Sequence, residues 1–144
     1  MATIRQVLVN KGREVHQIHP DASVLDALKV MAEHNIGALI VLDDGKLVGI
    51  ISERDYARKI MLKGKTSPGT RVRDIMSTHV ICATLDQSVE EGLAVMTAKA
   101  ARYLPILEEK RVVGIVSIGD LVKCVIADQK FTIEQLEHYM QGDR

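Results

Sequence analysis

Two short motifs, GIISERD and GIVSIGD, carry most of the polar chemistry of the sequence. Each places a serine at the end of an apolar run and a carboxylate three residues later: Ser52 with Asp55, and Ser117 with Asp120. This spacing is typical of an N-terminal helix cap. A carboxylate at such a corner can also bind the vicinal diol of a ribose, while the helix N-terminus beside it attracts a phosphate. The residues alone leave both interpretations open.

Other arrangements that could do chemistry are poorly supported. The five histidines have neither metal-ligand spacing nor a carboxylate cluster beside them, so we expect no metal site. The two cysteines lie far apart and are expected to be buried, reduced thiols. No nucleophile has an obvious base, so we expect no catalytic residue. Gly49 and Gly114 would keep their strands free of side-chain bulk where a ligand approaches.

The sequence repeats itself after 65 residues. Residues 21–58 align without a gap on 86–123, with 13 identities over 38 positions, where chance would give roughly two. A copy of this length buries too little surface to be stable alone, so we expect the two copies to pack together with approximate two-fold symmetry. Their functional surfaces should then form a related pair.

Each copy predicts the same succession of elements. A short extended stretch (15–18 or 80–83) precedes a cap-like Asp or Ser and then a helix with apolar residues at helical spacing. Two apolar strands joined by a tight polar turn follow, and a second helix closes the copy at 55–62 or 120–127. The fold class is therefore α/β (α+β), with β-α-β-β-α twice. A separate amphipathic helix is expected at 131–140, with Thr132 as its cap, packed on its own module or on a second subunit.

The composition excludes several classes of protein. The 144 residues contain 19 basic and 19 acidic side chains, so no charge excess favours nucleic acid or an anionic membrane surface. Only 3% of residues are aromatic, which argues against a base-stacking surface. No apolar run reaches the ~20 residues of a membrane span, and no signal peptide is apparent. We expect a soluble cytoplasmic protein.

The doubled G-h-h-S-x-x-D motif, with β-α-β-β-α around it, resembles a tandem pair of cystathionine-β-synthase-type (CBS) domains, a Bateman module, over about residues 12–127. The resemblance implies an adenosyl ligand, such as AMP, ADP, ATP, NAD or S-adenosylmethionine, in clefts between the repeats. The domains expected are a first repeat with its lead-in (1–62), a linker (63–73), a second repeat (74–128) and a C-terminal helix (129–144).

The resemblance also implies roles for particular residues. Asp55 and Asp120 would bind the ribose hydroxyls, with Ser52 and Ser117 near the sugar and phosphate. Arg102 would face the Asp55 cleft and bind phosphate there, together with the local cation Arg54. The positions expected around the adenine are His16, Ile81, Ile36 and Ala101, and Tyr103 is expected beside Arg102.

The two clefts should differ. Gly37 stands where the second copy has Arg102, and Gly119 where the first has Arg54, so the Asp120 cleft has less positive charge and more room. Lys99 or His34 could compensate. A polyphosphate or dinucleotide is expected at Asp55, and a nucleoside, a monophosphate or nothing at Asp120.

The leading functional hypothesis is a non-catalytic sensor of adenosyl nucleotides that needs no cofactor. Its output would go to an unidentified regulated protein or to its own oligomeric state, and the resemblance implies a flat, disc-like homodimer. One alternative is a structural interaction protein with vestigial clefts. Another is a small nucleotide hydrolase that uses a repeat Asp as its base.

Overall fold

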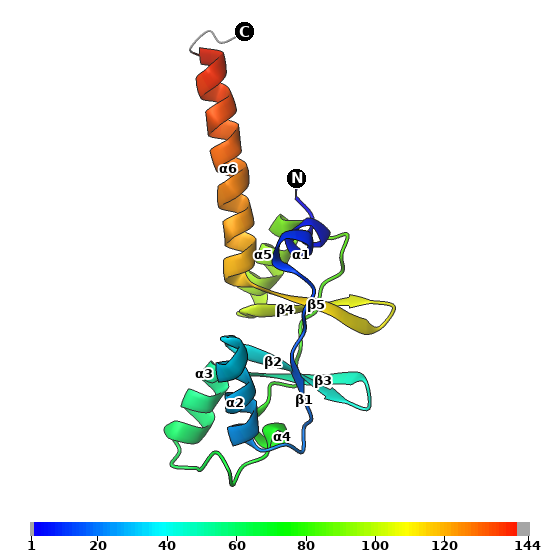
Figure 1. The fold of residues 1–144 in the computed structure, drawn as a ribbon, viewed down its shortest axis with the longest axis vertical. Helices are drawn as coiled ribbons and strands as arrows, with labels where there is room; N and C mark the ends of the chain where they lie inside the picture. The colour runs from blue at the N-terminus through cyan, green and yellow to red at the C-terminus, as the bar shows by residue number, and fades with distance from the viewer. Residues whose placement is uncertain (1, 141–144) are drawn as a thin grey trace.

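The first repeat forms the lower half of the molecule in Figure 1. The computed structural model describes residues 2–140. Helix α2 (Val24–His34) leads into the antiparallel strands β2 (Ala38–Asp43) and β3 (Lys46–Ser52). A short strand, β1 (Gln17–Ile18), extends this sheet by pairing in parallel with β2.

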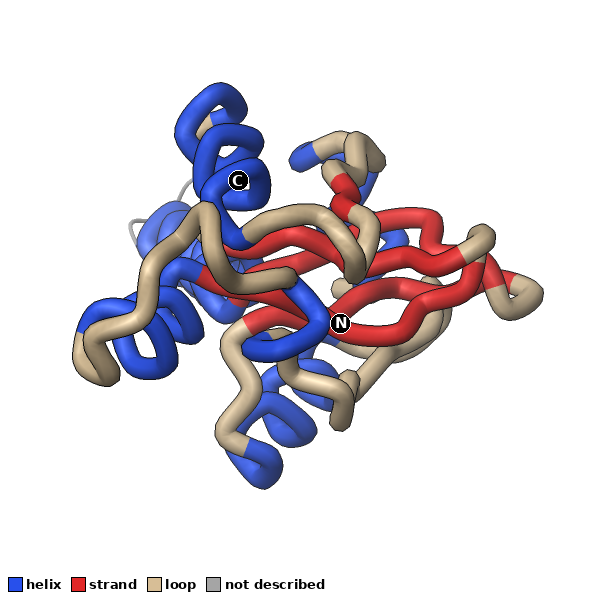
Figure 2. The backbone as a smooth tube through the Cα atoms, turned by 90° about the horizontal axis from the view of Figure 1, so that it is seen from below, coloured by secondary structure: helices blue, strands red, loops and turns tan. Residues whose placement is uncertain are grey.

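The second repeat has the same plan with a smaller sheet. Helix α5 (Val89–Lys99) leads into the antiparallel strands β4 (Tyr103–Glu108) and β5 (Arg111–Ser117). The extended segment expected at 80–83 is reduced to one parallel bridge, from Ala83 to Ile106. Figure 2 shows the strands of both repeats gathered in the middle of the body with helices around them. The mixed α/β class with two repeats is confirmed.

Serine caps begin the first helix of each repeat. The hydroxyl of Ser23 accepts from the Asp26 amide, and that of Ser88 accepts from the Glu91 amide, both at 3.0 Å. These bonds satisfy backbone donors that the first helical turn leaves without a partner. The preceding aspartates, also considered as caps, do not cap these helices.

Each repeat is completed by a lead-in helix that precedes the other repeat in the chain. Helix α1 (Ile4–Lys11), not predicted from the sequence, begins with a Thr3–Gln6 capping box and packs into the core of the second repeat. Helix α4 (Val72–Ile75) spans the end of the expected linker (63–73) and the start of the expected second repeat, and it packs into the core of the first. The buried residues of α1 are Ile4, Val7 and Leu8, and those of α4 are Val72 and Ile75.

The packing of each lead-in helix on the other repeat explains why each motif contains a glycine. A Cβ on Gly114 would lie 2.7 Å from Leu8 Cδ1, and one on Gly49 would lie 2.7 Å from Met76 Sδ. Both distances are too short for real contacts. The expectation that these glycines make room for a ligand is therefore wrong, because they make room for the exchanged lead-in segments.

The closing helices of the two repeats differ in length. Helix α3 (Glu53–Tyr56) runs into the π-helical turn η1 (Ala57–Met61), whereas α6 (Ile118–Met140) is one continuous helix that projects from the body (Figure 1). The expected separate helix with Thr132 as its cap is therefore wrong. The Thr132 hydroxyl instead donates to the Asp128 carbonyl one turn back, at 3.0 Å. Residues 141–144 of the expected C-terminal segment lie outside the described residues.

Candidate functional site

The two Ser–Asp motifs form matching corners between a strand and a helix. The Ser52 amide donates to Asp55 Oδ2 at 2.9 Å, and the Asp55 amide donates to Ser52 Oγ at 3.2 Å. The Ser117 amide donates to Asp120 Oδ2 at 2.8 Å, and the Asp120 amide donates to Ser117 Oγ at 3.1 Å. The capping interpretation is thus confirmed at both corners. It leaves part of each carboxylate for a second role.

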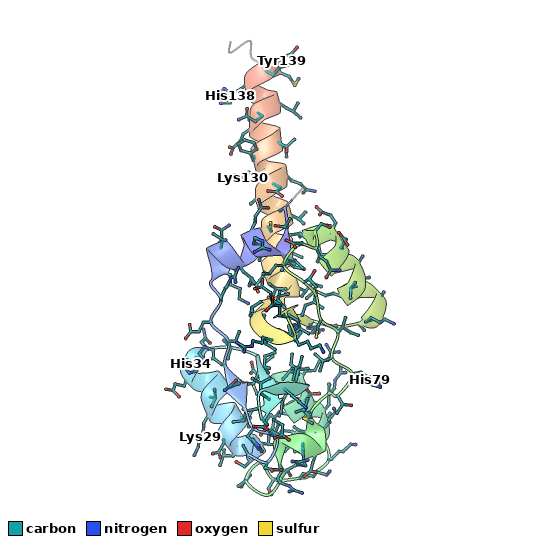
Figure 3. The ribbon with its side chains drawn as sticks, turned by 90° about the vertical axis from the view of Figure 1, so that its right-hand side faces the viewer. Lys29, His34, His79, Lys130, His138 and Tyr139 are labelled. Atoms are coloured by element: carbon teal, nitrogen blue, oxygen red, sulfur yellow. The ribbon has the colours of Figure 1, made fainter. Side chains whose placement is uncertain are left out.

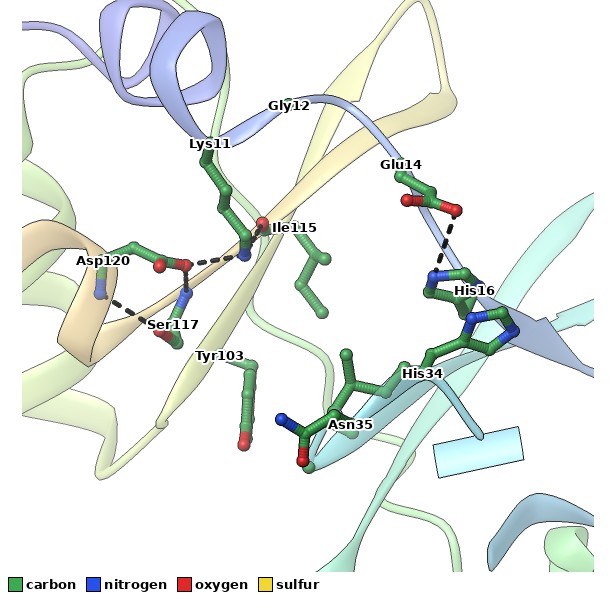
Figure 4. Close-up of a pocket in the computed structure, with 13 residues that line it drawn as sticks. Lys11, Gly12, Glu14, His16, His34, Asn35, Tyr103, Ile115, Ser117 and Asp120 are labelled. Atoms are coloured by element: carbon green, nitrogen blue, oxygen red, sulfur yellow. Dashed lines mark hydrogen bonds and ion pairs between the residues drawn. The ribbon is translucent and has the colours of Figure 1, made fainter. Parts of the chain in front are cut away.

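A cleft with a volume of ≈ 400 Å³ opens at the Asp120 corner (Figure 4). Small-molecule pockets in proteins usually enclose about 300–1,000 Å³. Ser117 and Asp120 line it from the second repeat, while His16, Ile36 and Gly37 line it from the first. The cleft therefore lies between the repeats and joins the ribose-binding residues expected in one copy to the base-binding residues expected in the other.

Lys11 supplies a cation to this cleft from the last turn of α1. Its Nζ donates to Asp120 Oδ2 at 2.6 Å and to the Ile115 carbonyl at 2.7 Å. Sequence reasoning expected little positive charge here and considered Lys99 or His34 as the compensating cation. His34 lines the cleft and Lys99 does not. Lys11 was missed because α1 was not predicted to pack on the second repeat, although Thr3 and Gln6 have the spacing of a capping box.

Lys11 and Ser117 keep Asp120 ionised. Burial by itself would raise the pKa of this carboxyl, but the hydrogen bonds from Lys11 and Ser117 outweigh it and lower the pKa below the ordinary value. The hydrogen bonds that Asp120 accepts within the described residues all end on Oδ2, so Oδ1 keeps its lone pairs. An ionised carboxylate with an available oxygen is a suitable acceptor for a sugar hydroxyl.

The wall of the cleft opposite Asp120 is a stack of imidazole rings. The ring centroids of His16 and His34 lie 3.7 Å apart with an angle of 20° between the planes. His16 Nε2 lies 3.5 Å from Glu14 Oε1, which holds one edge of the stack. With Ile36 beside them, these flat rings form a surface on which a planar base could lie. His16 and Ile36 therefore stand where the resemblance places adenine.

Tyr103, expected beside Arg102, lines the Asp120 cleft. A Cβ on Gly37 would come within 2.6 Å of Tyr103 Oη, so the hydroxyl fills the room that Gly37 was expected to leave for a ligand. Burial, followed by the charges of Glu53 and Asp120, raises the pKa of the Tyr103 hydroxyl, with Arg102 opposing. Tyr103 is therefore a neutral donor at the floor of the cleft.

The Asp55 corner is more strongly basic. Lys59 Nζ lies 3.2 Å from Asp55 Oδ1 and donates to the Ile75 carbonyl at 2.8 Å. The positive charges of Arg102 and then Arg58 lower the pKa of the exposed Arg54 guanidinium. Arg54 and Arg102, from different repeats, are thus close enough to repel, and an anion between them would relieve that repulsion.

Two residues expected near adenine lie outside the Asp120 cleft. Ile81 packs against the core of the second repeat. The Ala101 amide donates to the Met96 carbonyl at 2.9 Å, where the turn after α5 leads into β4. Their assignment to the Asp55 cleft stays a prediction, as do those of Ser52, Arg54, Asp55 and Arg102.

The family model described as "CBS domain" matches residues 4–62 and 72–127, which together make up most of the chain. The chain belongs to the CBS-domain family. A curated relative of this CBS pair is the Arabidopsis thaliana protein named CBS domain-containing protein CBSX3, mitochondrial. It is 38% identical over 149 residues, with 97% of this chain and 72% of the relative covered.

Two solved structures of CBS proteins resemble this CBS pair throughout. One, from Burkholderia ambifaria MC40-6, is provisionally described as a signal-transduction protein; it is 44% identical, with a TM-score of 0.85 over 89% of this chain and 96% of the other. The other is the CBS domain pair of protein MJ0100 in complex with 5-methylthioadenosine and S-adenosyl-L-methionine. It is 28% identical, with a TM-score of 0.79 over 89% of this chain and 98% of the other.

Two further features are absent from residues 2–140. No helix there is both long and apolar enough to cross a membrane. No three His, Cys, Asp or Glu side chains gather there as metal ligands. Because one relative is mitochondrial by name, a cytoplasmic location for this CBS pair stays a prediction.

Proposed function

We propose that this CBS pair is a regulatory module that binds an adenosyl nucleotide in the cleft between its repeats and catalyses no reaction. The observation that carries the proposal is the arrangement in one cleft of an ionised carboxylate (Asp120), a cation (Lys11) and a flat wall (His16 with His34). These are partners for a ribose, a phosphate and a base respectively. The complex of the MJ0100 pair with two adenosyl compounds supports this ligand class.

Lys11 favours a phosphate-bearing ligand at this cleft. When ribose hydroxyls approach Asp120, Lys11 can exchange its bond to Oδ2 for one to a phosphate oxygen and remain paired. A neutral nucleoside, bound through the available Asp120 Oδ1, offers Lys11 no phosphate oxygen and gains nothing from its charge. AMP, ADP, ATP or NAD should therefore bind more tightly than adenosine. S-adenosylmethionine, whose sulfonium carries a positive charge, should gain less from Lys11.

The Asp55 corner would bind a second, more highly charged ligand. Arg54 and Arg102 would hold its phosphates, with Asp55 and Ser52 at the sugar and Ile81 and Ala101 at the base. Occupancy of the clefts would then be transmitted to a regulated protein or to the assembly of copies of this chain.

A thermal-shift panel of AMP, ADP, ATP, NAD, S-adenosylmethionine and adenosine tests the proposal. A ligand at 100 times its dissociation constant should stabilise the fold by about 2.7 kcal/mol, or several degrees in Tm. Asp120→Asn, which keeps an acceptor for the cap, should reduce the shift, while Asp86→Asn, at an exposed ion pair, should not. No shift with any nucleotide would favour vestigial clefts. Product formation detected by chromatography would favour a hydrolase.

A further inference from the structure

The outer half of α6 lies entirely in solvent. Every residue from 126 to 140 is exposed, and this segment, a helix about 22 Å long at 1.5 Å per residue, projects from the body (Figures 1 and 3). Figure 3 shows Lys130 and Tyr139 on this projection, away from both repeats. An isolated helix of about this length is marginal in water. A partner along its side would therefore stabilise the projection.

Apolar residues form a continuous stripe along α6. At 100° per residue, seven positions from 118 to 140 fall within an arc of about 80°, and Gln129 is the only polar residue among them. The apolar members are 41–83% exposed. They are Ile118, Val122, Ile126, Ile133, Leu136 and Met140. The stripe starts beside the body and continues to the tip, so a second helix could lie along its whole length.

Charges along one flank of this stripe have a definite order. Lys123 and Lys130 lie on the half nearer the body, and Glu134 and Glu137 lie nearer the tip, all within the next 80° of the helix surface. None takes part in an ion pair within residues 2–140. When two copies of a helix pair antiparallel about a two-fold axis, each flank faces the same flank in reverse order. This order of charges is therefore complementary to itself in the antiparallel arrangement.

We propose that the α6 stripe is an interface with a second copy of this chain, in which the two α6 helices pair antiparallel about an axis beside residue 131. This axis sets Val122 opposite Met140 and Ile126 opposite Leu136 of the other copy. The same axis brings Lys123 to Glu137 and Lys130 to Glu134. The apolar residues and the charged residues thus favour the same register. Flanking charges select the orientation of paired helices in coiled coils in this way. The proposal is independent of nucleotide binding.

Sedimentation equilibrium on the full chain and on charge-reversed variants tests the pairing. The unmodified protein should be a dimer at micromolar concentration. Lys123→Glu with Lys130→Glu should raise the dimer dissociation constant at least tenfold, and adding Glu134→Lys with Glu137→Lys should restore it to within about threefold. Asp128→Lys, on the other side of the same helix, is the matched control and should leave it unchanged.

Restoration by the fourfold variant separates a specific pairing from simple destabilisation, and circular dichroism checks that each variant is folded. A monomeric unmodified protein would overturn the proposal. A dimer that is unaffected by the Lys123→Glu, Lys130→Glu variant, or by Ile126→Asp with Leu136→Asp, would also overturn it, because association would then use another face. If the variant with all four charge reversals did not restore the weakened dimer association, the proposal would likewise be overturned.

Cross-linking tests the orientation separately. Single variants Val122→Cys and Met140→Cys are made in a chain with Cys82→Ser and Cys124→Ser, then mixed and oxidised. Antiparallel pairing should give the mixed 122–140 disulfide as the main product. If each variant instead links chiefly to its own kind, the helices run parallel and the proposed register is wrong.

Discussion

Replacing Lys11 by Met should separate phosphate recognition from nucleoside recognition in the Asp120 cleft. Methionine keeps the length of the side chain and removes its charge. A charge-assisted hydrogen bond to phosphate is worth about 1.5–3 kcal/mol. Lys11 is 35% exposed, so solvent screening places the loss near the lower limit, which corresponds to about a tenfold weaker binding of AMP. Adenosine should bind about equally well, because it has no phosphate for Lys11 and its sugar hydroxyls can use the available Asp120 Oδ1.

Calorimetry with AMP and adenosine measures both effects. Arg54→Ala and Arg102→Ala are included in the background, so that the phosphate effect comes from the Asp120 cleft. The matched control is Arg5→Met, which removes the 2.9 Å ion pair between α1 and Asp86 outside the cleft. Equal weakening of AMP and adenosine by Lys11→Met would refute the reasoning, because Lys11 would then only position α1. The same weakening by Arg5→Met would lead to the same conclusion.

Three further predictions concern stability and the second corner. The pKa of Asp120 is lowered in the folded state, so the ionised carboxylate should stabilise the fold by an amount on the order of 1 kcal/mol for this partly exposed pair. This stabilisation should be present above the ordinary pKa of 3.8 and disappear as pH falls through the folded-state pKa. Urea unfolding of the native chain and of Asp120→Asn from pH 6 to 3 measures this, and parallel curves would contradict it. Leu8→Ala should lower the free energy of unfolding by about 2–5 kcal/mol. Gly114→Ala should lower it by about 1–3 kcal/mol in the native chain, and by less in a chain that already carries Leu8→Ala, since the added methyl group meets Leu8. Additive losses in a double-mutant cycle would show that this contact is unimportant. Arg102→Ala should weaken ATP or NAD more than adenosine, and an equal loss in calorimetry would contradict its assignment to phosphate.

Local patterns predicted the repeated elements well. The helices at Val24 and Val89, the hairpin strands and the Ser–Asp corners all depend on periodicity and capping within a few residues. The alignment of the two copies also predicted that Ser52 and Ser117 have the same role. These features need no information about which segments meet in space.

Features that depend on long-range packing were missed. Nothing within residues 1–12 indicates that α1 packs on strands about 100 residues later, so Lys11 was not connected with Asp120. The Thr132–Gln135 spacing resembles a cap, but no Gly or Pro interrupts 120–140, and the preceding helix continues through it. The place of Tyr103 in the Asp120 cleft was not predicted, because alternation along β4 does not say which repeat its side chain meets.

The exchanged lead-in helices also constrain the order in which the chain can fold during synthesis. Residues 4–11 leave the ribosome well before their partners Leu85, Leu104 and Leu121. Helix α1 must therefore wait, with its apolar face exposed, until the 110 residues from 12 to 121 have been added. Closing so long a loop lowers the folding rate more than the final stability. Helix α1 should thus be among the last elements to become ordered, and a nascent chain halted before Leu121 should leave α1 accessible to proteases and chaperones.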